Sequence, residues 1–142
     1  CHQKLSLESK EYFHLASTGT KEPSAAMFYN DAKPDSIFFQ GMALQKLGKK
    51  SEALELFKTL TIYGEKHIDD LIKVDYFAIS LPSFLIFNED LQRSNRVHCN
   101  YLIGLGLLGQ KNTQNSKPYF DEVHKEDINH QGYYGITQEI IV

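Results

Sequence analysis

The fold of this chain is decided by residues 35–60, DSIFFQGMALQKLGKKSEALELFKTL, which have the pattern of two helices joined by a tight turn. In the first helix, apolar or small residues recur at helical spacing from Ile37 to Leu47. Gly48 is expected to end that helix, because glycine adopts the left-handed conformation at little steric cost. We expect Ser51 to cap the second helix. Its apolar stripe comprises Ala53, Leu54, Leu56, Phe57 and Leu60.

Two small residues lie where these helices would cross. Gly41 on the first helix and Ala53 on the second allow the two backbones to approach closely, and Phe57 is expected to fill the space beyond them. A single helical pair of this kind buries its apolar faces poorly, so further helices should pack on both sides of it.

Helical patterns also account for most of the remaining chain. Asn88 is a plausible cap for the helix that follows it, and Asn112 is expected to take a left-handed turn between two later helices. In the last helix, Ile136, Ile140 and Ile141 should face inward. The expected helices besides the first pair are residues 4–17, 89–109, 113–125 and 128–141.

Residues 68–87, IDDLIKVDYFAISLPSFLIF, are the least regular part of the pattern. A helix is expected from Ile68 to about Leu81, where Pro82 would end it, and SFLIF is expected to form a short second helix. A helix that is apolar on much of its circumference is usually buried, so this segment should be covered by neighbours.

The totals indicate a single globular domain. The chain has 142 residues, of which 42% are hydrophobic and 23% charged, and its net charge is −3. Acidic and basic residues are interspersed, which argues against a nucleic-acid partner. The longest apolar runs fall far short of the roughly 20 residues that span a bilayer.

The two cysteines, Cys1 and Cys99, have no CxxC spacing and form no disulfide framework, so they leave the cellular compartment open. We expect no signal peptide within the given residues. A lipoprotein processed at Cys1 is one interpretation of the first residue. We favour a domain cut from a longer protein, because helical pattern begins by Leu5 with no flexible tether before it.

The sequence predicts no catalytic residue, no cofactor and no metal site. The histidines form neither an HExxH motif nor a Cys/His cluster. His98 and Cys99 are adjacent, but neighbours on a helix point about 100° apart, so Cys99 is more simply a buried apolar residue. Residues 104–109, GLGLLG, partly match a dinucleotide-binding fingerprint but lie within a helix, where close helix packing explains the glycines better.

The ordered series in residues 35–60 resembles the tetratricopeptide repeat, a helix-turn-helix unit of about 34 residues. Residues 4–17 resemble half of such a unit, and residues 103–123 resemble a second, degraded one. The resemblance implies an α-α superhelix of antiparallel helix pairs over residues 1–142, with an inserted helical segment at about 68–95. Residues carrying the main resemblance are Gly41, Leu44, Gly48, Ala53 and Phe57.

A narrower resemblance concerns the runs KPDSIFFQGMALQKLGK, VDYFAISLPSFLIF and NRVHCNYLIGLGLLG. They look like the repeat-containing C-terminal part of a family of large bacterial proteins in which β-sandwich domains come first. That family is associated with carbohydrate-active proteins through the domains that accompany it. The resemblance therefore implies that the full-length protein is carbohydrate-related.

The resemblance implies a non-catalytic module that binds a protein segment or other domains of its own chain. The alternative is a helical region that lines the cleft of an attached carbohydrate-active enzyme domain. We expect the 68–87 segment, rather than a partner, to fill the concave groove, and we expect the isolated chain to self-associate through the face of residues 4–17. The expected concave-face residues are Asp35, Phe38, Met42, Gln45, His98, Tyr101 and Leu105.

Overall fold

The computed structural model of the chain describes residues 2–25, 33–72 and 84–139. Within these ranges the chain forms helices and no strand, which confirms the predicted all-α fold. The helices are α1 (His2–Ala16), α2 (Pro34–Lys46), α3 (Lys50–His67), α4 (Phe84–Gly109), α5 (Thr113–Glu126) and α6 (Gln131–Glu139).

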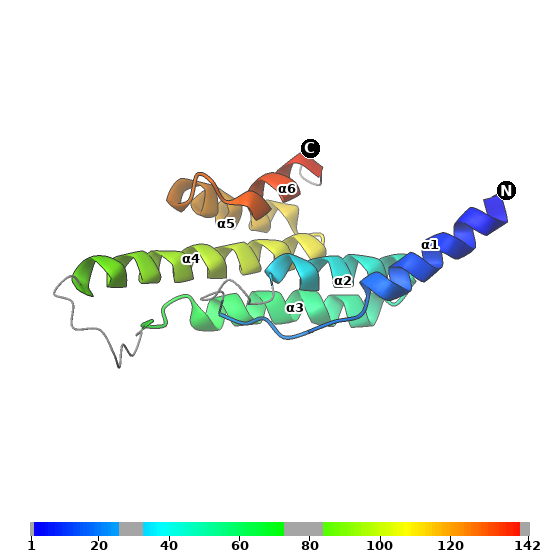
Figure 1. Cartoon of the computed structure of the whole chain (residues 1–142), viewed down its shortest axis with the longest axis horizontal. Coiled ribbons are helices and arrows are strands. Elements are labelled where there is room, and N and C mark those ends of the chain that lie inside the picture. Colours follow the sequence, from blue (N-terminus) through cyan, green and yellow to red (C-terminus); the bar gives the residue numbers. More distant parts are fainter. Residues whose placement is uncertain (1, 26–32, 73–83, 140–142) are drawn as a thin grey trace.

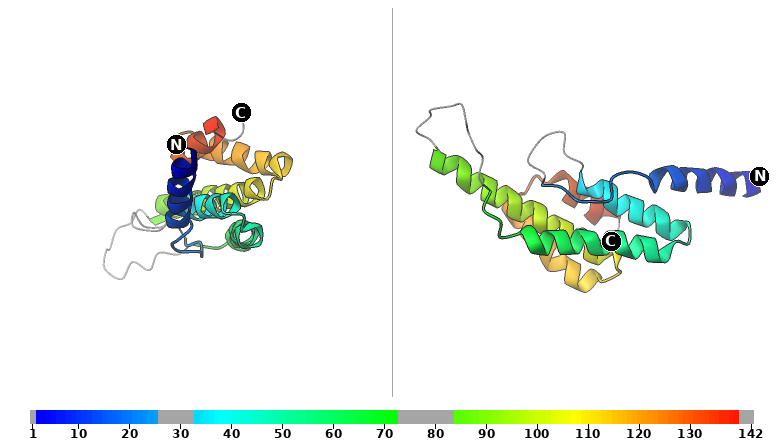
Figure 2. Two further views of the ribbon diagram at one scale, coloured as in Figure 1. Left: turned by 90° about the vertical axis from the view of Figure 1, so that its right-hand side faces the viewer. Right: turned by 90° about the horizontal axis from the view of Figure 1, so that it is seen from below.

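Consecutive helices run antiparallel to one another, and α2, α3 and α4 pack together as the centre of the molecule (Figure 1). Helix α4 has 26 residues, which corresponds to about 39 Å. Helix α5 packs along α4, and α6 lies beside α5. Helix α1 meets α2 near its own C-terminal end and then projects away from the other helices (Figure 2).

Phe57 is the point at which the three central helices meet. Its side chain on α3 is fully buried. A Cβ atom on either Gly41 of α2 or Gly109 of α4 would overlap its ring. The ring therefore lies between two glycines, and the expected roles of Gly41 and Phe57 are confirmed.

Helices α3 and α4 also approach closely at two glycines. A Cβ on Gly106 would lie 2.5 Å from the Phe57 carbonyl oxygen, and a Cβ on Gly64 would lie 2.6 Å from the Cys99 carbonyl oxygen. Real Cβ atoms do not approach backbone atoms this closely, so both positions need glycine for the observed helix separation. The GLGLLG run thus serves close helix packing, as predicted.

The α2–α3 pair and the α4–α5 pair repeat the same contacts. Gly104 faces Phe120 across α4 and α5, where a Cβ would lie 2.9 Å from the ring, as Gly41 faces Phe57 across α2 and α3. The two glycines are 63 residues apart, and so are the two phenylalanines. The turns match as well, since Gly48 and Lys111, also 63 residues apart, both have positive φ (80° and 62°). The chain therefore contains an internal helix-pair repeat.

Four local predictions are corrected by the structure. Lys111, not Asn112, takes the left-handed conformation, because it stands where the first pair has Gly48. Helix α3 begins one residue before Ser51, with Lys49 as its N-cap and no side-chain cap hydrogen bond. Leu54 is 40% exposed, because Leu56 and Leu60 already fill the inward side of α3.

The fourth correction concerns the expected insert at about 68–95. Helix α3 ends at His67, and residues 68–72 are not helical. Helix α4 begins at Phe84, so Asn88 lies inside the helix and does not cap it, and Phe84 to Phe87 of SFLIF belong to this long helix. Residues 73–83, and with them most of the groove-filling prediction, lie outside the described residues, as do Ile140 and Ile141.

Candidate binding cleft

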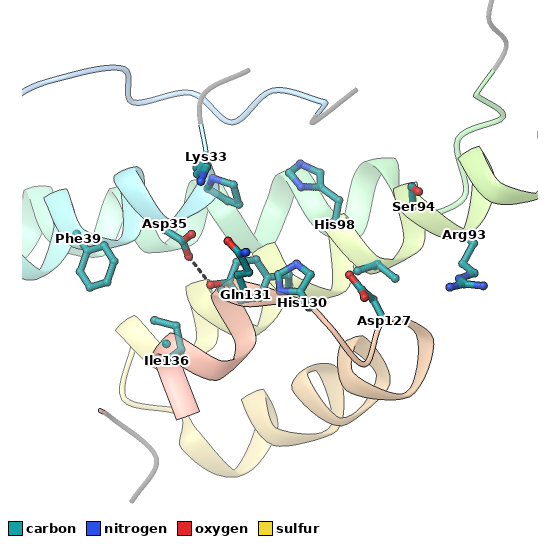
Figure 3. A pocket seen from close by; sticks show the side chains of 15 residues that line it. Lys33, Asp35, Phe39, Arg93, Ser94, His98, Asp127, His130, Gln131 and Ile136 are labelled. Atoms are coloured by element: carbon teal, nitrogen blue, oxygen red, sulfur yellow. Dashed lines mark hydrogen bonds between the residues drawn. The ribbon is translucent and has the colours of Figure 1, made fainter. Parts of the chain in front are cut away.

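A cleft of about 750 Å³ lies between the start of α2, the middle of α4 and the start of α6 (Figure 3). Its apolar wall includes Phe39, which is 48% exposed, together with the buried side chains of Val97 and Ile136. Its charged residues and histidines are Lys33, Asp35, Arg93, His98, Asp127 and His130.

The floor of the cleft is held by a hydrogen bond between α4 and α2. The Tyr101 hydroxyl donates to Oδ1 of Asp35. Burial, and then the neighbouring Asp35 carboxylate, raise the pKa of Tyr101 above its ordinary value, so the hydroxyl stays protonated and remains a donor. The Tyr101 ring also packs edge-on against Phe120 of α5 at 6.1 Å between ring centroids. Tyr101 therefore ties three helices together beneath the cleft.

The wall formed by α6 begins at His130, the residue just before the helix. Nδ1 of His130 accepts a 3.1 Å hydrogen bond from the Tyr133 backbone N–H, which is the geometry of an N-cap. The His130 ring lies over Tyr101, with 4.5 Å between ring centroids. Burial lowers the pKa of His130, although Asp127 and Asp35 act in the opposite direction. The neutral ring is thus the form that fits this position.

The rim of the cleft carries both signs of charge. Nε of Arg93 lies 3.8 Å from a carboxylate oxygen of Glu126, and the Arg93 side chain is 55% exposed. An exposed pair of this kind contributes little to stability, so Arg93 can turn toward a ligand at small cost. Lys33 and Asp127 line the cleft on opposite sides, from the residue before α2 and from the α5–α6 loop (Figure 3).

The expected concave-face residues do not form one surface. Asp35, His98 and Tyr101 do line the cleft. Nε2 of His98 lies 2.9 Å from the Ser24 carbonyl oxygen, so this edge of the ring faces the segment before α2.

The other four expected residues lie elsewhere. Phe38 and Leu105 have no exposed surface and belong to the core. Met42 packs against that core, and Gln45 donates to the Gly109 carbonyl oxygen at the far end of α4. The expected apolar floor is therefore interior in this structure, where the Phe38 ring packs against Phe57 of α3.

Sequence reasoning missed the contribution of the C-terminal part of the chain. Gly132 and Gly135 of α6 line the cleft, and a Cβ on Gly132 would overlap the Tyr101 hydroxyl. Gly132 was the available signal in the sequence. A glycine weakens the start of a helix, so its presence there suggests that a neighbouring element approaches closely. Nothing in the sequence showed which neighbour it was.

The described residues hold no group of three or more histidine, cysteine, aspartate or glutamate side chains that could bind a metal ion. Burial, with a smaller contribution from Asp70, raises the pKa of the Cys99 thiol to about 11, so at neutral pH it is protonated and unreactive. In the part of the chain that the structure describes, no helix combines the length and apolar character needed to cross a bilayer.

No protein-family model matches the chain. No solved structure matches it either.

Proposed function

We propose that this chain is a non-catalytic, tetratricopeptide-like interaction module. Its ligand would be an extended segment of protein, from a partner or from another domain of the same polypeptide. The internal repeat of helix pairs, with equivalent glycine–phenylalanine contacts 63 residues apart, supports the repeat-module part of the proposal.

The observation that carries the binding part is the cleft between α2, α4 and α6. Its volume of about 750 Å³ is within the range of ligand pockets, roughly 300–1,000 Å³. The half-exposed Phe39 in the apolar wall is a suitable contact for an apolar side chain of a bound segment. Lys33 and Arg93 can pair with acidic groups of that segment, and Asp127 with a basic one.

Panning a random peptide library against the whole chain tests this proposal. Selected peptides should bind the unmodified protein and lose at least tenfold in affinity for Phe39→Glu, because the variant places a charge in the apolar wall. The matched control is Leu54→Glu, which changes a leucine of similar exposure on α3, away from the cleft. It should bind as the unmodified protein does.

Two outcomes would count against peptide binding in the cleft. One is that no peptide is selected. The other is that Phe39→Glu and Leu54→Glu bind the selected peptides equally well. An oligosaccharide panel, run on the same three proteins, addresses the carbohydrate-related alternative: binding there that depends on Phe39, without peptide binding, would replace the proposal.

A further inference from the structure

Helix α6 is a short wall with a titratable group at its start. It has nine residues, and Ile136 is its buried apolar anchor. At its N-terminus the Tyr133 N–H, one of the orphan donors of the first turn, is satisfied by Nδ1 of His130. Because a ring nitrogen can accept a hydrogen bond only when it carries no proton, this cap exists only in one protonation state.

The same imidazole ring, just before α6, also contacts α4. It lies 4.5 Å from the Tyr101 ring, and Gly132 follows two residues later against the Tyr101 hydroxyl. A change at His130 therefore acts on the cap and on the helix contact together.

Charged and titratable groups from the neighbouring elements face this position. On α5, the His124 ring stacks on the ring of Tyr133, with 4.9 Å between ring centroids. Asp127 precedes it in the α5–α6 loop, and Asp35 approaches from α2. Lys33, just before α2, lines the same cleft, as do Arg93 and His98 on α4, and Tyr101 beneath it stays neutral. The carboxylates favour a charged His130, and burial opposes it.

We propose that His130 is a pH-sensitive latch: a proton taken from solvent onto Nδ1 breaks the hydrogen bond to the Tyr133 N–H, releases α6 from α4 and opens the cleft. The step forms one N–H bond and breaks one hydrogen bond, and it needs no other reactant. Release of α6 opens the cleft because α6 forms one wall of it, through Gln131, Gly132, Gly135 and Ile136. The latch does not depend on which ligand the cleft binds.

The direction of the pH effect follows from linkage. Burial lowers the pKa of His130 below its ordinary value of 6.5 while α6 is docked, and release restores it. The released state then binds more protons, so docking is fully stabilised above pH 6.5 and weakens as pH falls toward the lowered pKa. In that window the ratio of docked to released α6 changes by up to about tenfold per pH unit.

Hydrogen exchange followed by NMR on the whole chain between pH 7.5 and 5.0 tests the latch. After correction for intrinsic exchange, the α6 amides should lose protection relative to α4 amides by up to about tenfold per pH unit below pH 6.5. The ring resonances of His130 should titrate over the same range. In His130→Asn, α6 should stay protected throughout, because asparagine caps helices and does not titrate.

His14→Gln on α1 is the control, and it should behave as the unmodified chain does. His130→Ser, a second cap that does not titrate, replaces His130→Asn if that variant fails to fold by circular dichroism. The latch is wrong if α6 protection in the unmodified chain is flat with pH. It is equally wrong if a folded His130 variant keeps the same pH dependence, since another group would then be titrating.

Discussion

The ring of Phe57 offers a quantitative test of how the central helices are held together. Phe57→Ala removes a fully buried phenyl group, and such truncations cost about 3–5 kcal/mol. For a chain of this length, about 3–4 °C of melting temperature per kcal/mol is expected, so the melting temperature should fall by roughly 10–20 °C. Leu54→Ala on the same helix is the control and should cost less than about 1 kcal/mol, because that side chain is 40% exposed.

A double-mutant cycle with Gly41 makes the test specific to the contact. Gly41→Ala alone should cost about 1–3 kcal/mol, since its new methyl group would overlap the Phe57 ring. In the Phe57→Ala background the same methyl group enters the vacated space, so it should cost little or even stabilise the helix. The two changes should therefore couple by at least about 1 kcal/mol in urea unfolding. Strictly additive costs would show that the ring does not lie against Gly41.

Three further predictions concern single positions. Gly106→Ala should destabilise by about 1–3 kcal/mol in urea unfolding, because its Cβ meets a backbone carbonyl oxygen of α3 that cannot move aside; Gly135→Ala, with open space around its Cβ, should instead gain about 0.5–1 kcal/mol. Lys111→Gly should stabilise by up to about 1 kcal/mol in the same assay, because it relieves a positive φ of 62°, whereas Lys111→Ala should give no gain. In a Cys1→Ser background, Cys99 should react with a disulfide reagent at pH 8 only as fast as the chain unfolds, because the thiol is buried. Its pKa of about 11 also leaves roughly one thiol in a thousand ionised at that pH. Rapid labelling without denaturant would contradict its burial.

The helix pattern was predictable because it rests on local rules. Spacing of apolar residues located the central helices, and Gly48 marked a turn that does have positive φ. Lys111 was missed at the equivalent turn, because a lysine gives no local sign of a left-handed conformation that the surrounding helices impose. Leu54 was misplaced, because an apolar stripe wider than the contact area leaves its edge residue in solvent.

The cleft was only partly predictable, because it depends on how distant segments meet. Asp35, His98 and Tyr101 were expected on one surface, and they do line it. The contribution of His130 depends on α6 folding back over α4, which no local pattern encodes. A histidine followed three residues later by a tyrosine looks ordinary until the backbone N–H of the tyrosine is seen to reach the ring nitrogen.

The position of Phe57 between two glycines also bears on how the molecule opens. A ring enclosed by α2 and α4 cannot leave its site unless all three central helices separate, so these helices should unfold as one cooperative unit. Helix α1 packs mainly against α2. Its side chains Leu7, Tyr12 and Leu15 are exposed, in contrast to the enclosed ring of Phe57. It should open at a lower free energy than the central helices, so denaturant would release it first and a protease would cut there before the centre yields.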